Sequence, residues 1–103
     1  MDIAKDGSAI IGGHVVRKHG VVVLRGLATF QKPIAVPHLS ERFGEEYSDV
    51  HLYTTLNRLC KLNPSLCIRA EVKVKVREVE LRRVTYEATE VTKNFFRTPK
   101  TDT

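Results

Sequence analysis

Apolar and polar residues separate onto two sides of a helix between residues 48 and 62. Leu52, Leu56 and Leu59 are four and three residues apart, so they stack on one side of a helix with about 3.6 residues per turn. The opposite side and its two flanks are polar: His51, Thr54, Thr55, Asn57, Arg58 and Lys61. The pattern predicts an amphipathic helix with one side in a core and the other side exposed.

Both ends of this helix carry recognisable signals. Either Ser48 or Asp49 can cap the start, since a short oxygen-bearing side chain accepts a hydrogen bond from the free N–H groups of the first turn. Asn63 precedes Pro64, and a residue before proline is pushed out of the helical region. We therefore expect the helix to span residues 48–62.

Two further helices are predicted before it. The apolar spacing over residues 14–30 fits one helix face, but Gly20 and a run of three valines disfavour a helix, so a strand over residues 21–24 is the alternative. Residues 36–43 predict a short helix with proline in its first turn, where no N–H partner is required. Gly44 is placed to stop it in a left-handed conformation.

After residue 64 the period of the apolar residues changes to about 2, which is typical of strands. One strand is predicted where three valines alternate with cations: Val72, Val74 and Val76. We expect these valines to face a core. Residues 83–88 alternate in the same way, whereas Val79 and Leu81 are out of phase with both strands. This change fits a hairpin tip or a bulge, although no glycine or asparagine marks a tight turn.

These elements predict an α+β chain with one domain, because 103 residues leave little room for a second lobe. Residues 1–12 are polar and glycine-bearing, which indicates a flexible arm, with a short strand over residues 9–11 as an alternative. Residues 13–96 should form the domain. Residues 97–103 are polar and are expected to be a disordered tail.

The charge is unevenly divided along the chain. Residues 51–103 hold eleven of the 17 basic residues and six of the 12 acidic ones, which accounts for the whole net charge of +5. Binding to phosphate needs positive charge concentrated on one face, and this half contains the helix over residues 48–62 and the hairpin. The alternative is a soluble surface that is merely mildly basic.

Composition and motifs exclude several classes of protein. With 42% hydrophobic and 28% charged residues the chain is typical of a soluble globular protein, and no run approaches the roughly 18 apolar residues of a membrane span. The N-terminal residues lack the pattern of a signal peptide, so we expect a cytosolic protein with reduced cysteines. Cys60 and Cys67 are too far apart for a zinc-binding CxxC pair, so no metal or cofactor is expected.

Catalytic patterns are also missing. The serines have no nucleophile-elbow context, and Gly12-Gly13 lacks the lysine and helix start of a phosphate-binding loop. The histidines are scattered along the chain: His14, His19, His38 and His51. We therefore do not expect an enzyme.

Residues 48–59, Ser-Asp-Val-His-Leu-Tyr-Thr-Thr-Leu-Asn-Arg-Leu, resemble the recognition helix of winged helix-turn-helix DNA-binding proteins. In the ferric-uptake-regulator and PadR-like groups this helix commonly carries a tyrosine and a closing Asn-Arg-Leu. Residues 36–44 resemble the helix that leads into it, and residues 85–90 the point where the second wing strand turns into a C-terminal helix. The resemblance implies a winged helix-turn-helix with a three-helix core and a C-terminal β-hairpin wing.

Two departures limit what this resemblance implies. Thr54 stands where an arginine often follows the helix tyrosine in those groups, which removes a phosphate or guanine contact. The metal-binding histidine cluster and the second domain of the ferric-uptake group have no counterpart, so metal sensing is not implied.

Together, the resemblance and the charge pattern predict a transcriptional regulator that binds double-stranded DNA with sequence specificity. The helix over residues 48–62 would read base edges in the major groove, and the basic hairpin would follow the backbone or the minor groove. Five cations are the expected hairpin contacts, with the last two nearest the tip: Lys73, Lys75, Arg77, Arg82 and Arg83.

A homodimer is expected, because one unit of this size reads few base pairs and two helices can reach half-sites about one helical turn apart. Residues 14–30 and the segment around Phe95 and Phe96 are the expected dimer contacts. The alternative function is a winged-helix module that docks on another protein. The neutral N-terminal half favours it, as do three acidic residues near the start of the main helix: Glu45, Glu46 and Asp49.

Overall fold

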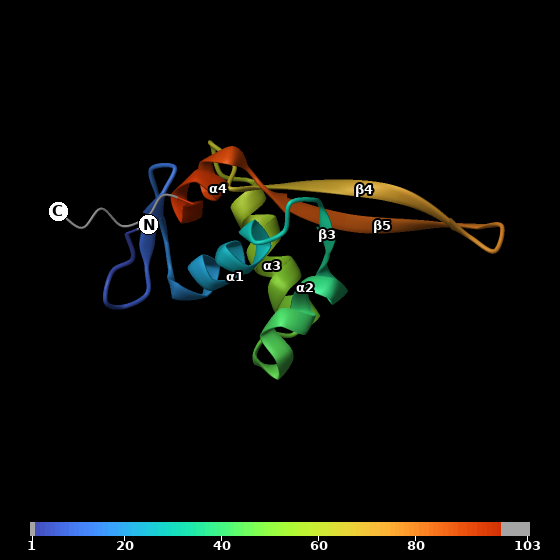
Figure 1. Ribbon diagram of the computed structural model, residues 1–103, viewed down its shortest axis with the longest axis horizontal. Helices are drawn as coiled ribbons and strands as arrows, with labels where there is room; N and C mark the ends of the chain where they lie inside the picture. The colour runs from blue at the N-terminus through green and yellow to red at the C-terminus, as the bar shows by residue number, and fades with distance from the viewer. Residues whose placement is uncertain (1, 98–103) are drawn as a thin grey trace.

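The computed structural model describes residues 2–97, which form an α+β fold of helices around the base of a long β-hairpin (Figure 1). The elements are β1 (Ala9–Ile11), β2 (His14–Val16), α1 (Lys18–Ala28), β3 (Ile34–Ala35), α2 (Val36–Phe43), the 3-10 turn η1 (Gly44–Glu46), α3 (Asp49–Cys60), β4 (Cys67–Val76), β5 (Val79–Ala88) and α4 (Glu90–Arg97). Strands β1 and β2 form one antiparallel sheet, and the order β3-β5-β4 forms the other.

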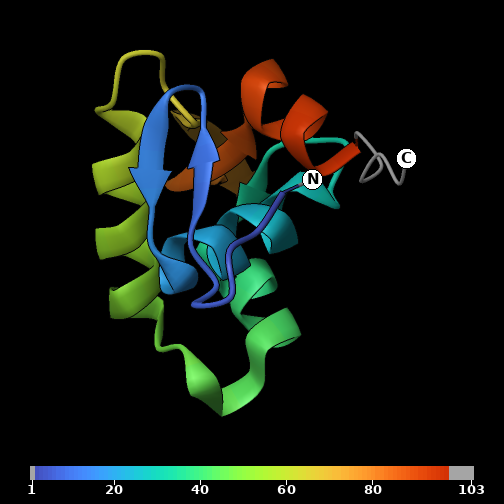
Figure 2. The ribbon, with the colours of Figure 1, turned by 90° about the vertical axis from the view of Figure 1, so that its left-hand side faces the viewer.

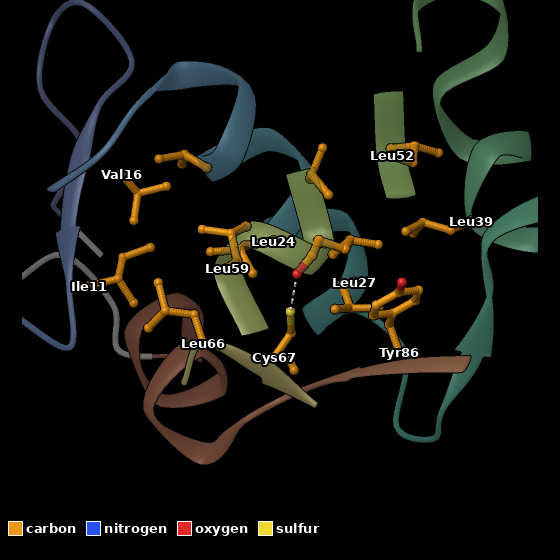
Figure 3. Close-up of a cluster of buried hydrophobic side chains, with 14 of the residues drawn as sticks. Ile11, Val16, Leu24, Leu27, Leu39, Leu52, Leu59, Leu66, Cys67 and Tyr86 are labelled. Atoms are coloured by element: carbon orange, nitrogen blue, oxygen red, sulfur yellow. Dashed lines mark hydrogen bonds between the residues drawn. The ribbon is translucent and has the colours of Figure 1, made fainter. Parts of the chain in front are cut away.

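The core lies where the helices meet one face of the hairpin base (Figure 3). Leucines from α1, α2 and α3 are fully buried there together with Tyr86 and Cys67, from β5 and β4. Ile11 and Val16, from the small β1–β2 sheet, close the core at the opposite end. The core therefore includes strand residues as well as helix residues.

Helix α3 is close to its prediction. Leu52, Leu56 and Leu59 are all buried, so the predicted apolar side is confirmed. Ser48 is the residue that caps the helix, because its Oγ accepts a hydrogen bond from the backbone N–H of His51 at 3.2 Å. The helix ends at Cys60, two residues before the predicted end.

Helix α2 has the predicted bounds, Val36–Phe43, and Gly44 follows with φ of 61° and ψ of −138°. The positive φ was expected, but this ψ lies outside the left-handed helical region, in a part of conformational space open essentially to glycine.

The first helix differs from its prediction. Residues 14–16 form β2, which pairs with β1, and α1 begins only at Lys18. The alternative strand over residues 21–24 is wrong, because Val21, Val23 and Leu24 are buried on one side of α1. Gly20 is explained by close packing, since a Cβ there would lie 2.7 Å from a methyl carbon of Val16.

Part of the expected N-terminal arm belongs to the folded structure. The alternative strand over residues 9–11 is present as β1, and both Ala9 and Ile11 are buried. The expected domain boundary at residue 13 therefore falls inside the turn between β1 and β2. At the other end, Arg97 is the last residue of α4, and residues 98–103 of the expected tail lie outside the described residues.

The hairpin tip is the two-residue turn Arg77-Glu78, with φ of 50° and 65°. Pairing is continuous from Val76 opposite Val79 down to Cys67 opposite Ala88, so neither a bulge nor a tip at Val79 is present. Two positive φ values are what a tight hairpin turn requires, and here residues other than glycine adopt them.

Beyond β3 the hairpin leaves the helices and continues as a free two-stranded arm, which we define as residues 71–84 (Figure 1). The arm makes the molecule elongated, with extents of 57 × 27 × 22 Å. The predicted core position of the valines is wrong, since Val72 and Val76 are 42% and 44% exposed. Their strand extends past the helices, so no core is present beneath them.

Replacing Leu56 with alanine should destabilise the fold. Its side chain is fully buried in α3, and truncation of a buried leucine costs about 2–5 kcal/mol. Thermal unfolding followed by circular dichroism should show a clear fall in Tm. Val50→Ala is the matched control, because Val50 lies on the same helix and is 75% exposed. Equal Tm values for the two variants would contradict this placement of the helix.

Candidate nucleic-acid interface

The two faces of the arm differ in chemistry because successive side chains of a strand point to opposite sides. Directly opposed residues on β4 and β5 share a side, and their register defines both faces. The polar face carries Glu71, Lys73, Lys75, Glu80, Arg82 and, at its inner end, Val84. The apolar face carries Val72, Val74, Val76, Val79, Leu81 and, at its inner end, Arg83.

The polar face lies on the same side of the sheet as α3. Cys67 and Tyr86 belong to this side and both bond to α3: the Cys67 thiol donates to the Leu56 carbonyl at 3.3 Å, and the Tyr86 hydroxyl donates to Asn57 Oδ1 at 2.6 Å. The exposed side of α3 and the polar face of the arm therefore adjoin each other.

Tyr86 forms the junction between α3 and the arm. Its ring is buried, and burial raises the pKa of its hydroxyl, while the neighbouring Arg69 guanidinium opposes that rise. The hydroxyl stays protonated at neutral pH and can donate to Asn57. Asn57 Oδ1 accepts this bond, so the orientation of the Asn57 amide is fixed by Tyr86.

Three of the predicted α3 contacts lie on its exposed side: Thr54, Arg58 and Lys61. The Thr54 hydroxyl donates to the Val50 carbonyl of its own helix at 2.9 Å. Asn57 is half-buried at the edge of α3 that meets the hairpin. These residues form one continuous strip toward the polar face of the arm.

Two other predicted contacts lie elsewhere. Thr55 is buried, because it follows Leu52 by three residues and precedes Leu59 by four and so joins the apolar side. His51 is exposed, but its ring stacks on Tyr47 with centroids 5.1 Å apart. It also meets the ring of His19, on α1, edge-on at 5.9 Å, so it lies on the side of α3 near α1.

The arm separates the cations that the sequence grouped together. Lys73 lies opposite Arg82 on the polar face, and its ammonium is 3.6 Å from a carboxylate oxygen of Glu80. Lys75 lies opposite Glu80 on the same face. Arg77 is the cation at the tip.

The prediction that Arg82 and Arg83 lie nearest the tip is wrong. They lie several residues below it, opposite Lys73 and Val72. They also point to opposite faces of the sheet, since they are adjacent in one strand. Only Arg82 shares the side of α3.

Sequence reasoning missed two residues of this region. Arg69 precedes Lys73 by four residues and therefore shares its side of the strand. This even spacing is visible in the sequence and could have identified Arg69. Tyr53, on α3, lines a hollow of about 310 Å³ together with Arg82, Arg83 and Val84 of β5. The alternation pattern identifies strand positions, but no pattern in the sequence shows which helix lies beneath them.

The acidic residues lie at the other end of α3. Glu45 and Glu46 are exposed in η1, and Asp49 is exposed in the first turn of the helix. Negative charge at a helix N-terminus complements the helix dipole, but it also repels phosphate. Arg58 and Lys61 are at the C-terminal end of α3, beside the hairpin base, whereas the α3 residue beside the arm is Tyr53.

The described part of the chain gives no indication of a metal centre or a membrane span. Within residues 2–97, no three His, Cys, Asp or Glu side chains come together to hold a metal ion. None of the helices in this range is long and apolar enough to cross a bilayer. The sulfur atoms of Cys60 and Cys67 lie 3.0 Å apart as free thiols, and burial raises the pKa of the Cys67 thiol far above its usual range.

No protein-family model matches the chain, and comparison with curated proteins and with solved structures found no match. The argument for function therefore rests on the geometry and charge of this surface.

The raised pKa of Tyr86 leads to a prediction about alkaline stability. A hydroxyl that holds its proton more tightly when folded stabilises the fold fully below the unfolded pKa of about 10, and that stabilisation is lost as pH rises toward the folded pKa. Urea unfolding at pH 9 and at pH 11 should show a smaller loss of free energy of unfolding in Tyr86→Phe than in the unaltered chain. Tyr53→Phe is the control, and an equal effect of both changes would contradict the assignment.

Proposed function

We propose that this chain is a winged-helix protein that binds double-stranded DNA and regulates transcription as a homodimer. The order α1-β3-α2-α3-β4-β5, with strand order β3-β5-β4, supports this reading, because it puts two helices before a β-hairpin that can act as a wing. In this arrangement α3 is the recognition helix and the arm is the wing.

One observation carries the proposal: the exposed side of α3 and the polar face of the arm adjoin on one side of the sheet, joined by the Tyr86–Asn57 bond. A helix fits the major groove of B-DNA, where base edges are read, and a two-stranded arm can follow the adjoining backbone or minor groove. Arg58 is the proposed guanine reader, and Lys73 and Arg82 are the proposed phosphate contacts.

A docking module is the second candidate, because two features do not suit DNA. Val50 is 75% exposed on α3 beside Asp49, and the turn before it carries Glu45 and Glu46. An apolar and acidic surface of this kind fits a protein partner better than phosphate. We favour DNA binding, since cations lie both on α3, at Arg58, and on the polar face of the arm, at Lys73 and Arg82.

Purified protein should bind duplex DNA at low salt and release it as salt rises. Each phosphate neutralised by a cation releases condensed counterions, so the logarithm of the binding constant should fall linearly with the logarithm of salt concentration. Fluorescence anisotropy at several salt concentrations measures this slope. A folded chain that binds no duplex at low salt favours the docking module.

Two adjacent arginines provide a sharper test. Arg82→Ala should weaken binding to all sequences alike and reduce the salt slope, and Arg83→Ala should do so less, because its strand position is on the opposite face although it borders the same hollow. Titration of a selected and a scrambled duplex with each variant makes the comparison. If Arg83→Ala has the larger effect, the polar face is not the DNA-binding face.

Arg58→Ala should instead reduce discrimination between the selected and the scrambled duplex. The expected loss is about 1–3 kcal/mol on the selected duplex if the guanidinium pairs with guanine, with little change on the scrambled one. The same titrations measure it. An equal loss on both duplexes would make Arg58 a backbone contact rather than a reader of bases.

A further inference from the structure

The apolar face of the arm is exposed along its whole length. Four of its side chains are between 42% and 57% exposed: Val72, Val76, Val79 and Leu81. Val74 lies among them, half-buried, directly opposite Leu81. A continuous apolar strip of this kind on a projecting element marks an interaction surface.

The strip continues into a hollow at the base of the arm. This hollow has a volume of about 360 Å³ and lies beside Val72 and Val74, with Pro33, Ile34 and Ala35 also in its lining. Lys32, His38, Arg83 and Thr85 also line the hollow, so the apolar strip ends there in a mixed surface with two cations. The strip lies on the opposite side of the sheet from the polar face proposed for DNA.

We propose that a second copy of this chain covers this surface, with the two arms packed face to face and antiparallel. This proposal rests on the proposed function, because it gives that homodimer a specific interface. Dimer formation is nevertheless measured on the protein alone, without DNA. The expected contacts of α1 offer less, because Val21, Val23, Leu24 and Leu27 are buried in the chain's own core.

The strip is complementary to itself in an antiparallel arrangement. Along the arm, the successive pairs on this face are Val76 with Val79, Val74 with Leu81, and Val72 with Arg83. When two arms are centred on the middle pair, the tip pair of each covers the Val72–Arg83 pair of the other. The two Arg83 side chains then lie at opposite ends of the contact, so like charges do not meet.

In this arrangement the two polar faces stay uncovered and point away from each other, on the two outer sides of the dimer. In the view along the long axis, α3 lies at one edge of the molecule, across from α4 (Figure 2), and at the hairpin base it contacts β4. Face-to-face, antiparallel arms are related by a two-fold axis. This axis runs midway between the two sheets, parallel to them and perpendicular to the strands. A rotation about this axis keeps the β4 edges of both copies on the same side of the dimer.

The size of the strip predicts a weak dimer. Two strands about 5 Å apart, with a contact of about six residues at about 3.3 Å each, give a strip of roughly 20 × 10 Å per copy. Even with the hollow included, this is below the roughly 800 Å² per partner of a standard interface. We therefore expect a dissociation constant in the micromolar range or weaker.

Sedimentation equilibrium from about 1 µM to about 1 mM covers this range. The test variant is Val79→Thr with Leu81→Thr, and the matched control is Glu80→Thr with Arg82→Thr, which changes alternate positions of the same strand on the polar face. Threonine keeps the preference for strand in both. The dissociation constant should rise at least tenfold in the test variant and change less than threefold in the control, with circular dichroism unchanged in both.

Three outcomes overturn the proposal. A chain that stays monomeric to about 1 mM excludes the second copy as the occupant, whatever else the arm binds. A dimer that only the control variant weakens lies on the polar face, and a dimer that neither variant weakens uses another surface. DNA titration of the unaltered chain separates the two proposals. If only the test variant weakens the dimer and the unaltered chain binds no duplex, this interface is supported and the proposed function is contradicted.

Discussion

The burial of Tyr86 against α3 determines the direction of every side chain in the arm. Since strand residues alternate, an inward Tyr86 puts Arg82 on the side of α3 and puts Arg83, Leu81 and Val79 on the other side. Pairing with β4 then assigns its cations and its valines to the same two faces. One buried ring with one hydrogen bond, at 2.6 Å to Asn57, therefore separates the surface proposed for DNA from the surface proposed for a second copy.

Sequence reasoning succeeded where a local pattern decides the structure. The spacing of Leu52, Leu56 and Leu59 was enough to place the buried side of α3, and the glycine after α2 was enough to end that helix. The start of α1 was misplaced because residues 14–16 pair with β1, a contact made outside the helix. Thr55 was assigned to the polar flank on its chemistry, although its spacing put it beside the leucines.

The arm shows the clearest limit of a sequence pattern. Alternation correctly separates valines from cations, but it does not show where the supporting helices stop. Val72 and Val76 were expected to face a core because valine usually does, and only the three-dimensional structure shows that β3 ends beside Thr85. Similarly, the tip at Arg77-Glu78 lacks the glycine or asparagine that makes such turns visible in a sequence.

Attachment at one end also gives the arm a mechanical property. From the last pairing with β3 to the tip, the arm extends about 20 Å, at roughly 3.3 Å per residue, and only its own ladder supports it. A rotation of about 10° at its base displaces the tip by roughly 3 to 4 Å over this length, comparable to the rise of one base pair. The base of the arm lies beside Tyr86 and Asn57, so a change in angle there would be largest in its effect at the tip.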